Sequence, residues 1–124
     1  MIYLDTHILV WLYAGEVGRL SAVGQQLLRQ HDLLVSPIVS LEVQYLYEIQ
    51  RIQVDAPTLM ADLRYRLGMK VCEKPFDRVV ERSWQYDWTR DPFDRLIVAQ
   101  ASLDDDLLLT KDETIRAHYL FARW

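Results

Sequence analysis

The sequence predicts an α/β fold in which a central parallel sheet of four to five short strands is flanked by helices. The main observation is alternation, because short apolar runs typical of buried strands are separated by longer stretches with helical periodicity. Strands that alternate with helices favour a parallel sheet with right-handed crossovers. A length of 124 residues suits a single domain, residues 1–124, with one hydrophobic core.

Four short apolar runs are the predicted strands. They cover residues 2–4, 33–35, 71–72 and 107–109. Each run is apolar throughout, as expected of strands that are buried on both faces. The tail, residues 113–124, is expected to hold a short helix and an edge strand.

Helix start signals divide the stretches between these strands. Ser36-Pro37 and Asp91-Pro92 each place a capping side chain before a proline at the first helical position. Helices are therefore predicted over residues 7–13, 21–30, 37–50, 57–68, from 75 onward, and over 91–101. The side chains predicted to face the core are Leu20, Val23, Leu27 and Leu28 in the second helix, Ile38, Leu41, Tyr45, Leu46 and Ile49 in the third, and Phe76, Val79, Val80 and Trp84 in the fifth.

Composition excludes several classes of protein. No apolar run approaches the roughly 20 residues of a membrane span, and an N-terminus without a basic leader favours a cytoplasmic protein. Cys72 is the single cysteine, so neither an internal disulfide nor a cysteine-based zinc site is expected. The formal charge of −4 argues against nucleic-acid binding through charge alone. It leaves room for a nuclease whose acids are gathered around a cation.

Asp94 stands out in the stretch from Thr89 to Ala101. At helical spacing it shares a face with Ile97, Val98 and Ala101. That face is expected to be buried, and a buried carboxylate needs a cation or strong hydrogen-bond donors. Asp94 is therefore a candidate metal ligand, whereas N-capping alone can explain Asp91.

Three further acids are expected to join Asp94 at one edge of the sheet. Asp5 and Asp112 each follow a predicted strand, and Glu42 lies early in a helix that begins near the same edge. Open α/β sheets bind their ligands at this edge, and a hard divalent cation would offset the repulsion between four carboxylates. Two alternatives stay open: Asp5 as a helix cap, and Glu42 in a partly buried salt bridge. The run Asp104–Asp106 is expected to be a solvated turn.

Several of these segments share a family likeness. Leu-Asp-Thr at residues 4–6, Ser-x-Glu at 40–42, RDPFDRLIVAQA at 90–101 and Leu-Thr-Lys-Asp at 109–112 together resemble the PIN-domain ribonucleases. The chain is most similar to the VapC toxins of bacterial toxin–antitoxin pairs. The resemblance covers essentially the whole chain, and RDPFDRLIVAQA is its most specific part.

The resemblance implies a PIN-like three-layer fold and a metal-dependent endoribonuclease. Asp5, Glu42, Asp94 and Asp112 match the catalytic acids that bind Mg²⁺ or Mn²⁺, and the residues expected to support them are Thr6, Asp91 and Thr110. It also implies an RNA substrate of the tRNA or rRNA class, a VapB-type antitoxin and a homodimer. Whether one metal or two is bound stays open. The candidate phosphate contacts are Arg90, Arg95, Lys111 and Arg116.

The sequence counts against two other functions. A phosphoacceptor receiver domain needs adjacent acids after its first strand, but Thr6 follows Asp5. A catalytically silent PIN-like binding module would keep the acids for structure, and a complete set of four counts against it. The glycine motifs of dinucleotide-binding and P-loop proteins do not occur.

Overall fold

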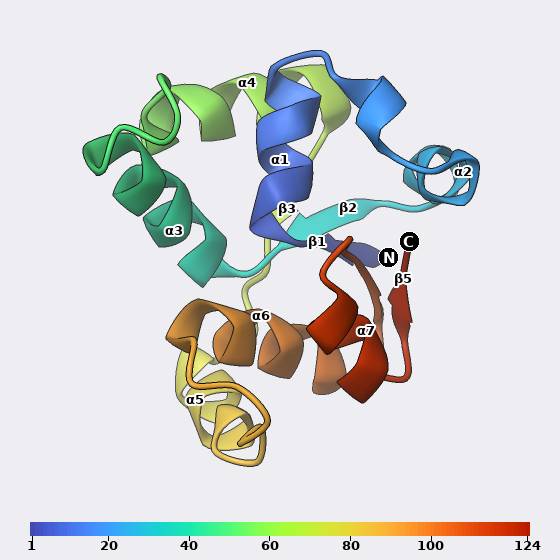
Figure 1. The fold of residues 1–124 in the computed structure, drawn as a ribbon, viewed down its shortest axis with the longest axis vertical. Helices are drawn as coiled ribbons and strands as arrows, with labels where there is room; N and C mark the ends of the chain where they lie inside the picture. Colours follow the sequence, from blue (N-terminus) through green and yellow to red (C-terminus); the bar gives the residue numbers. More distant parts are fainter.

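Five parallel strands form one sheet in the computed structural model, which describes residues 1–124 (Figure 1). The strands are β1 (Ile2–Leu4), β2 (Leu33–Val35), β3 (Lys70–Val71), β4 (Leu107–Leu109) and β5 (Ala122–Arg123). They lie in the order β3-β2-β1-β4-β5. Tyr3 of the central strand pairs with Leu34 on one side and Leu108 on the other. The predicted fold class is therefore confirmed, including the edge strand in the tail.

The strand order places a topological switch point between β1 and β4. The chain runs from β1 through β2 to β3 and then crosses to β4 and β5 on the other side of β1. The helices are α1 (Thr6–Tyr13), η1 (a 3₁₀ turn, Val17–Arg19), α2 (Ala22–Gln30), α3 (Pro37–Glu48), α4 (Ala56–Leu67), α5 (Phe76–Ser83), α6 (Pro92–Ser102) and α7 (Glu113–His118). In Figure 1, α1, α3 and α4 lie above the sheet and α5 and α6 below it, which gives three layers. Sheets of this kind bind ligands where the strand order reverses.

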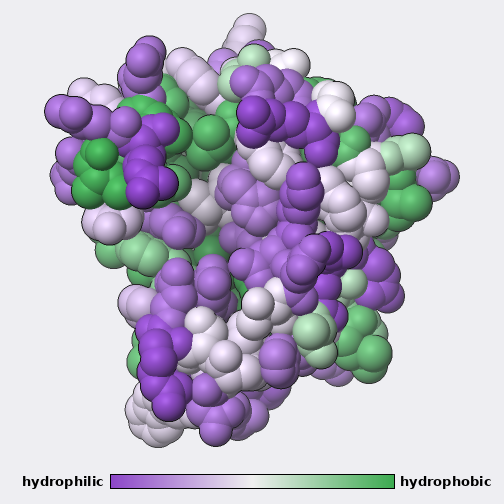
Figure 2. Space-filling view, in the orientation of Figure 1, coloured by the Kyte–Doolittle hydropathy of each residue, from purple (hydrophilic) through white to green (hydrophobic).

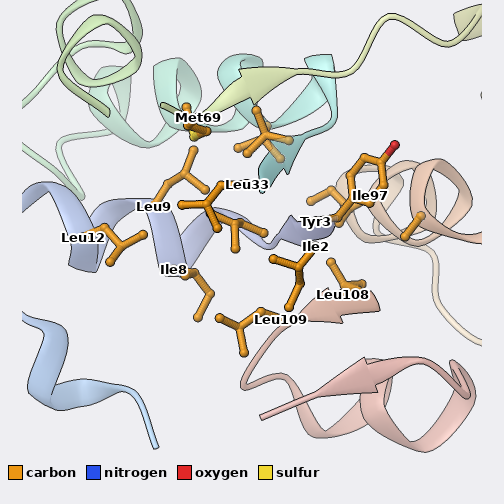
Figure 3. Packing of buried hydrophobic residues seen from close by; sticks show 14 of the residues in the cluster. Ile2, Tyr3, Ile8, Leu9, Leu12, Leu33, Met69, Ile97, Leu108 and Leu109 are labelled. Atoms are coloured by element: carbon orange, nitrogen blue, oxygen red, sulfur yellow. The ribbon is translucent and has the colours of Figure 1, made fainter. Parts of the chain in front are cut away.

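The hydrophobic core lies on both faces of the sheet. Every residue of β1 is buried, as expected of a central parallel strand. Figure 3 shows Ile8 and Leu9 of α1 on one side of β1 and Ile97 of α6 on the other, near Tyr3. None of the helices combines the length and the apolar character that crossing a membrane would require.

The predicted buried stripe of α3 is wrong at three of its five positions, while Ile38 is partly buried and packs against the core. The structure buries Val39 and Val43, whereas Leu41 and Tyr45 are 55% and 47% exposed and Ile49 is also exposed. Apolar residues occur on several sides of this helix, so periodicity alone does not determine which side faces the core. The consequence is an apolar stripe on the outer surface.

Smaller corrections concern α2 and α5. Val23 is exposed, and Gly24 instead faces the core, where an added Cβ would lie 3.4 Å from a methyl carbon of Leu109. In α5, Val79 is buried as predicted, but Val80 is exposed. Trp84 is 69% exposed because α5 ends at Ser83, so Trp84 lies beyond the helical stripe.

Candidate active site

Five carboxylates line a cleft of about 340 Å³ at the edge of the sheet where β1 and β4 end. The lining residues are Asp5, Thr6, His7, Val10, Trp11, Glu42, Leu46, Ile52, Asp91, Asp94 and Asp112. Figure 2 shows hydrophilic side chains across the middle of one face of the molecule, where α1, α6 and α7 meet. The structure thus brings together the four acids that the sequence singled out, and Asp91 with them.

Asp5 is held by hydrogen bonds at both carboxylate oxygens. It follows β1 directly and is only 4% exposed. The Thr6 N–H donates to Oδ1 at 2.8 Å, and the Thr110 hydroxyl donates to Oδ2 at 2.6 Å. Asp5 is therefore a helix cap, as the alternative interpretation proposed, and at the same time a fixed wall of the cleft.

Glu42 has a hydroxyl as its partner and no cation. The Thr6 hydroxyl donates to Glu42 Oε1, and no salt bridge of the chain involves Glu42. Burial raises the pKa of Glu42, the Thr6 hydrogen bond lowers it, and the charges of Asp5 and Asp91 raise it further. The salt-bridge interpretation of Glu42 is therefore wrong.

Asp94 and Asp91 lie at the start of α6 in different environments. Asp91 is exposed and caps the helix, because its Oδ1 accepts from the N–H groups of Phe93 at 2.9 Å and Asp94 at 3.3 Å. Asp94 lies in the first turn and is partly buried. Burial first, and then the charges of the other four cleft acids, raise the pKa of Asp94 to about 7.

Thr110 joins Asp112 to Asp5. Its side chain is fully buried, and its oxygen both donates to Asp5 and accepts from the Asp112 N–H at 3.0 Å. Asp112 caps α7 through a bond from the Ile115 N–H to Oδ1 at 2.9 Å. The hydroxyls of Thr6 and Thr110 thus hold two pairs of sequence-distant segments together around the cleft.

The sequence suggested only a supporting or surface role for His7, which in the structure connects the start of α1 to the loop after β4. The Lys111 N–H donates to His7 Nε2 at 2.9 Å, so the proton of a neutral imidazole lies on Nδ1. That nitrogen is 3.6 Å from Asp5 Oδ2. The signal in the sequence was the position of His7, two residues after Asp5.

Gln100 was also missed. It is fully buried on α6, and its Oε1 accepts from the Ser36 hydroxyl at 3.0 Å. Ser36 caps α3, so this bond ties the helix that carries Asp94 to the helix that carries Glu42. A lone polar residue within the apolar run of residues 96–101 could have indicated such a role.

None of the four candidate phosphate contacts lines the cleft. The guanidinium of Arg95 donates to backbone carbonyls at the end of α5, and that of Arg90 to a carbonyl of its own loop. Arg116 donates to the carbonyl of Lys111. The Lys111 ammonium lies 5.7 Å from the ring centroid of Trp124, beside the cleft.

A larger hollow of about 880 Å³ lies at the β3 edge of the sheet, lined in part by Tyr3, Cys72 and Lys74. It contains none of the five cleft acids. The Tyr3 hydroxyl donates to Cys72 Sγ at 3.0 Å, and Lys74 is turned toward Asp104, 2.7 Å away. The chemistry-bearing residues therefore gather in the smaller of the two hollows.

Comparison with known proteins gives a matching family, a protein of similar sequence and a solved structure of similar fold. Residues 2–119 match the PIN domain family. The chain is similar to Ribonuclease VapC22 from Mycobacterium tuberculosis (strain ATCC 25618 / H37Rv), with 31% identity over 123 residues, 94% of this chain and 91% of that protein. Its fold is similar to the crystal structure of VapBC2 from Rickettsia felis bound to a DNA fragment from their promoter, with a TM-score of 0.67. That likeness has 19% identity and covers 99% of this chain and 98% of the other.

Proposed function

Because the chain belongs to the PIN-domain family, and within it to the VapC ribonucleases, we propose that its acidic cleft is the active site of a metal-dependent endoribonuclease. As a VapC-type toxin, it hydrolyses RNA phosphodiester bonds. One observation carries the assignment of the site. Four acids from separate segments, Asp5, Glu42, Asp94 and Asp112, line one cleft that contains no lysine or arginine.

The chemistry of these donors fits Mg²⁺ or Mn²⁺. Carboxylate oxygens are hard ligands, and the repulsion that raises the pKa of Asp94 to about 7 is the cost a divalent cation would remove. No three acidic, histidine or cysteine side chains are close enough to form a closed metal site. Mg²⁺ keeps several waters and commonly uses only one or two carboxylates together with substrate phosphate, so an open arrangement is suitable.

Each residue has a distinct part in this proposal. Asp5 and Asp94, from β1 and α6, would hold the cation, with Glu42 and Asp112 completing the acidic wall. When bound, the cation would lower the pKa of the attacking water and offset charge on the phosphate. Thr6 and Thr110 fix the carboxylates of Glu42 and Asp5 through their hydroxyls. Asp91 keeps α6 aligned as its cap.

The test is cleavage of a panel of tRNA and rRNA fragments by the purified protein, with Mg²⁺ or Mn²⁺ and with EDTA. We expect discrete cuts that leave a 5′-phosphate and a 3′-hydroxyl. EDTA should abolish them, and Asp94→Asn should reduce them by about a hundredfold or more, the size of losing one transition-state stabiliser.

Asp32→Asn is the matched control. Asp32 is an exposed acid that immediately precedes β2, at the opposite edge of the sheet, and its replacement should leave cleavage unchanged. Cuts that persist in EDTA or in Asp94→Asn would contradict the assignment of the cleft. An absence of cuts across the panel, with no metal binding by calorimetry, would favour a silent binding module.

The partner we propose is a VapB-type antitoxin that covers the cleft. The support is the fold neighbour from Rickettsia felis, which is a VapBC2 complex. One equivalent of antitoxin per toxin is expected to abolish cleavage of the tRNA and rRNA fragments. Cleavage that continues in the assembled complex would contradict a partner that blocks this site.

We also propose a homodimer that uses the outer side of α3. Leu41, Tyr45 and Ile49 are spaced four apart along one side of this helix and are all exposed. Hydrophobic side chains lie over this region at the upper left of Figure 2. Exposed apolar patches of this kind are typical of protein–protein interfaces. Light scattering should give twice the chain mass, and Leu41→Asp should give the single-chain mass.

A further inference from the structure

Two tryptophans and two cations form a cluster at one rim of the acidic cleft, which we call the tryptophan platform. Its members are Trp11, Trp124, Arg19 and Lys111. The two indole rings meet edge to face, with centroids 6.1 Å apart. The Arg19 guanidinium lies 5.5 Å from the Trp11 ring centroid, and the Lys111 ammonium lies 5.7 Å from that of Trp124.

The platform is continuous with the site. Trp11 lines the cleft, and the His7 ring lies 5.0 Å from the Trp11 ring. His7 in turn accepts from the Lys111 N–H and faces Asp5. A ligand held on the platform would therefore lie beside the acids that we assign to phosphodiester hydrolysis.

The indole rings of the platform are held in place by packing and remain partly accessible. Trp11 and Trp124 pack against the hydrophobic core and are partly exposed. Such rings are already ordered, so a stacking partner meets a surface that is fixed in advance. Two of the three cation–π contacts of the chain occur on these rings.

The charge on the platform complements phosphate. Lys111 is exposed and has no carboxylate within 4.0 Å, in a chain with a formal charge of −4. Arg19 is partly compensated by Glu16 at 2.7 Å. Lys111 is therefore a positive charge next to the acidic cleft that no carboxylate compensates, and it lies over an aromatic ring.

We propose that the tryptophan platform binds unpaired nucleotides of the RNA that flank the bond in the cleft, with a base stacked on Trp124 and Lys111 paired with a phosphate. This deepens the proposed function and rests on it. The commitment to unpaired nucleotides follows from geometry, since a base inside a duplex has both faces covered by its neighbours. Aromatic faces combined with a nearby cation are the usual means of holding single strands without reading their sequence.

The experiment measures fluorescence anisotropy of a labelled, unstructured RNA of about twelve nucleotides, a length within the roughly 4–16 nucleotides of a single-strand site. The Asp94→Asn protein with Mg²⁺ is the parent, so that the RNA stays intact. Trp124→Ala should weaken binding about tenfold, whereas Trp124→Phe, which keeps an aromatic face, should stay within about threefold of the parent. Lys111→Met should weaken binding and reduce its dependence on salt by about one phosphate contact.

Trp84→Ala is the matched control, because it makes the same chemical change at an exposed tryptophan after α5, and it should leave RNA binding unchanged. A duplex of the same length should bind equally to the parent and to Trp124→Ala. Thermal melting checks that each variant is folded. If Trp124→Ala is unfolded, Lys111→Met still decides the result.

Equal RNA affinity in the parent, Trp124→Ala and Lys111→Met would overturn the platform and leave it as packing or as a surface for a protein partner. Failure of the parent protein to bind the RNA would also overturn the proposal. The two proposals fail separately. Loss of RNA binding in Trp124→Ala, with no cleavage by the unmodified protein, would keep the platform and reject the nuclease site. Metal-dependent cleavage with a KM unchanged by Trp124→Ala would keep the nuclease site and reject the platform.

Discussion

The acidic cleft and the turn Asp104–Asp106 both gather carboxylates, but only in the turn does a lysine form ion pairs with them. Lys74 Nζ lies 2.7 Å from Asp104 and 3.4 Å from Asp106, and the Lys74 hydrogen bond holds the pKa of Asp104 below its usual value. No lysine or arginine lies within 4.0 Å of the cleft carboxylates, and the pKa of Asp94 rises to about 7. The negative charges of the turn are thus compensated by a lysine, whereas those of the cleft have no such partner.

The difference separates a structural use of acids from a functional one. A carboxylate that gains a cation on folding stabilises the folded chain, whereas carboxylates crowded in a partly buried cleft oppose folding until something binds them. The uncompensated group is therefore the better candidate for chemistry.

The first prediction concerns pH and the free energy of unfolding. Because the pKa of Asp94 is raised to about 7 in the folded protein, the folded state binds the proton more tightly than the unfolded chain does. The contribution of Asp94 should therefore lower stability as pH rises from about 4 to about 7, by up to about 4 kcal/mol before solvent screening in the open cleft.

Urea denaturation of the metal-free protein at a series of pH values checks this. Asp94→Asn should remove the decline and be equally stable or more stable at pH 7. A loss of more than about 2 kcal/mol in Asp94→Asn would instead show that the carboxylate has a structural role. Asp104 should behave oppositely, because its lowered pKa stabilises the folded state above the acid range and that gain is lost as pH falls.

The second prediction concerns added metal. If a cation relieves the repulsion in the cleft, Mg²⁺ or Mn²⁺ should stabilise the protein by about 2.7 kcal/mol at a hundredfold excess over its Kd. The affinity should decrease as pH falls below about 7, because a proton on Asp94 competes with the metal. Thermal melting with MgCl₂, against NaCl at equal ionic strength, measures the effect. An equal gain in Asp94→Asn would locate the metal elsewhere.

The third prediction tests how the cleft holds its acids without cations. Thr110→Val keeps the shape of the side chain but leaves Asp5 Oδ2 and the Asp112 N–H without their partner. Since these groups are buried or partly buried, the cost should be about 1–3 kcal/mol. Thr110→Ser keeps the hydroxyl and should lose much less stability. Equal losses in the two variants by urea denaturation would mean that the methyl group, and not the hydroxyl, matters.

The sequence was most informative where local chemistry determines structure. Asp91 could be assigned as a helix cap because capping depends on a few neighbouring residues, and the structure confirms it in that role. The gathering of acids at one edge was predicted from the alternation of strands and helices, because parallel topology brings the ends of successive strands together. The order of the strands in the sheet was not predicted.

The sequence was least informative where the answer depends on contacts between distant segments. The pairing of Lys74 with Asp104 joins residues thirty positions apart, and the bond between Ser36 and Gln100 joins residues sixty-four apart. The buried side of α3 was predicted wrongly for a related reason. Apolar residues lie on several sides of this helix, so only its packing in the folded chain determines that Val43 is buried and Tyr45 exposed. Trp124 could be placed beside Trp11 at the rim of the cleft only once the structure showed β5 next to β4.

The smallest effect should come from the turn, and it offers the sharpest test of the comparison. Lys74→Met removes the cation, but Asp104 is exposed, so water can solvate its carboxylate. We expect a loss of at most about 1 kcal/mol and unchanged cleavage of RNA. The variant also leaves the turn without a compensating cation, like the cleft, but with Asp104 open to solvent. The decisive variant combines Lys74→Met with Asp94→Asn. If Mg²⁺ stabilised it, carboxylates without a compensating cation would be sufficient to bind the metal. If it did not, the partial burial of Asp94 is the property that sets the cleft apart.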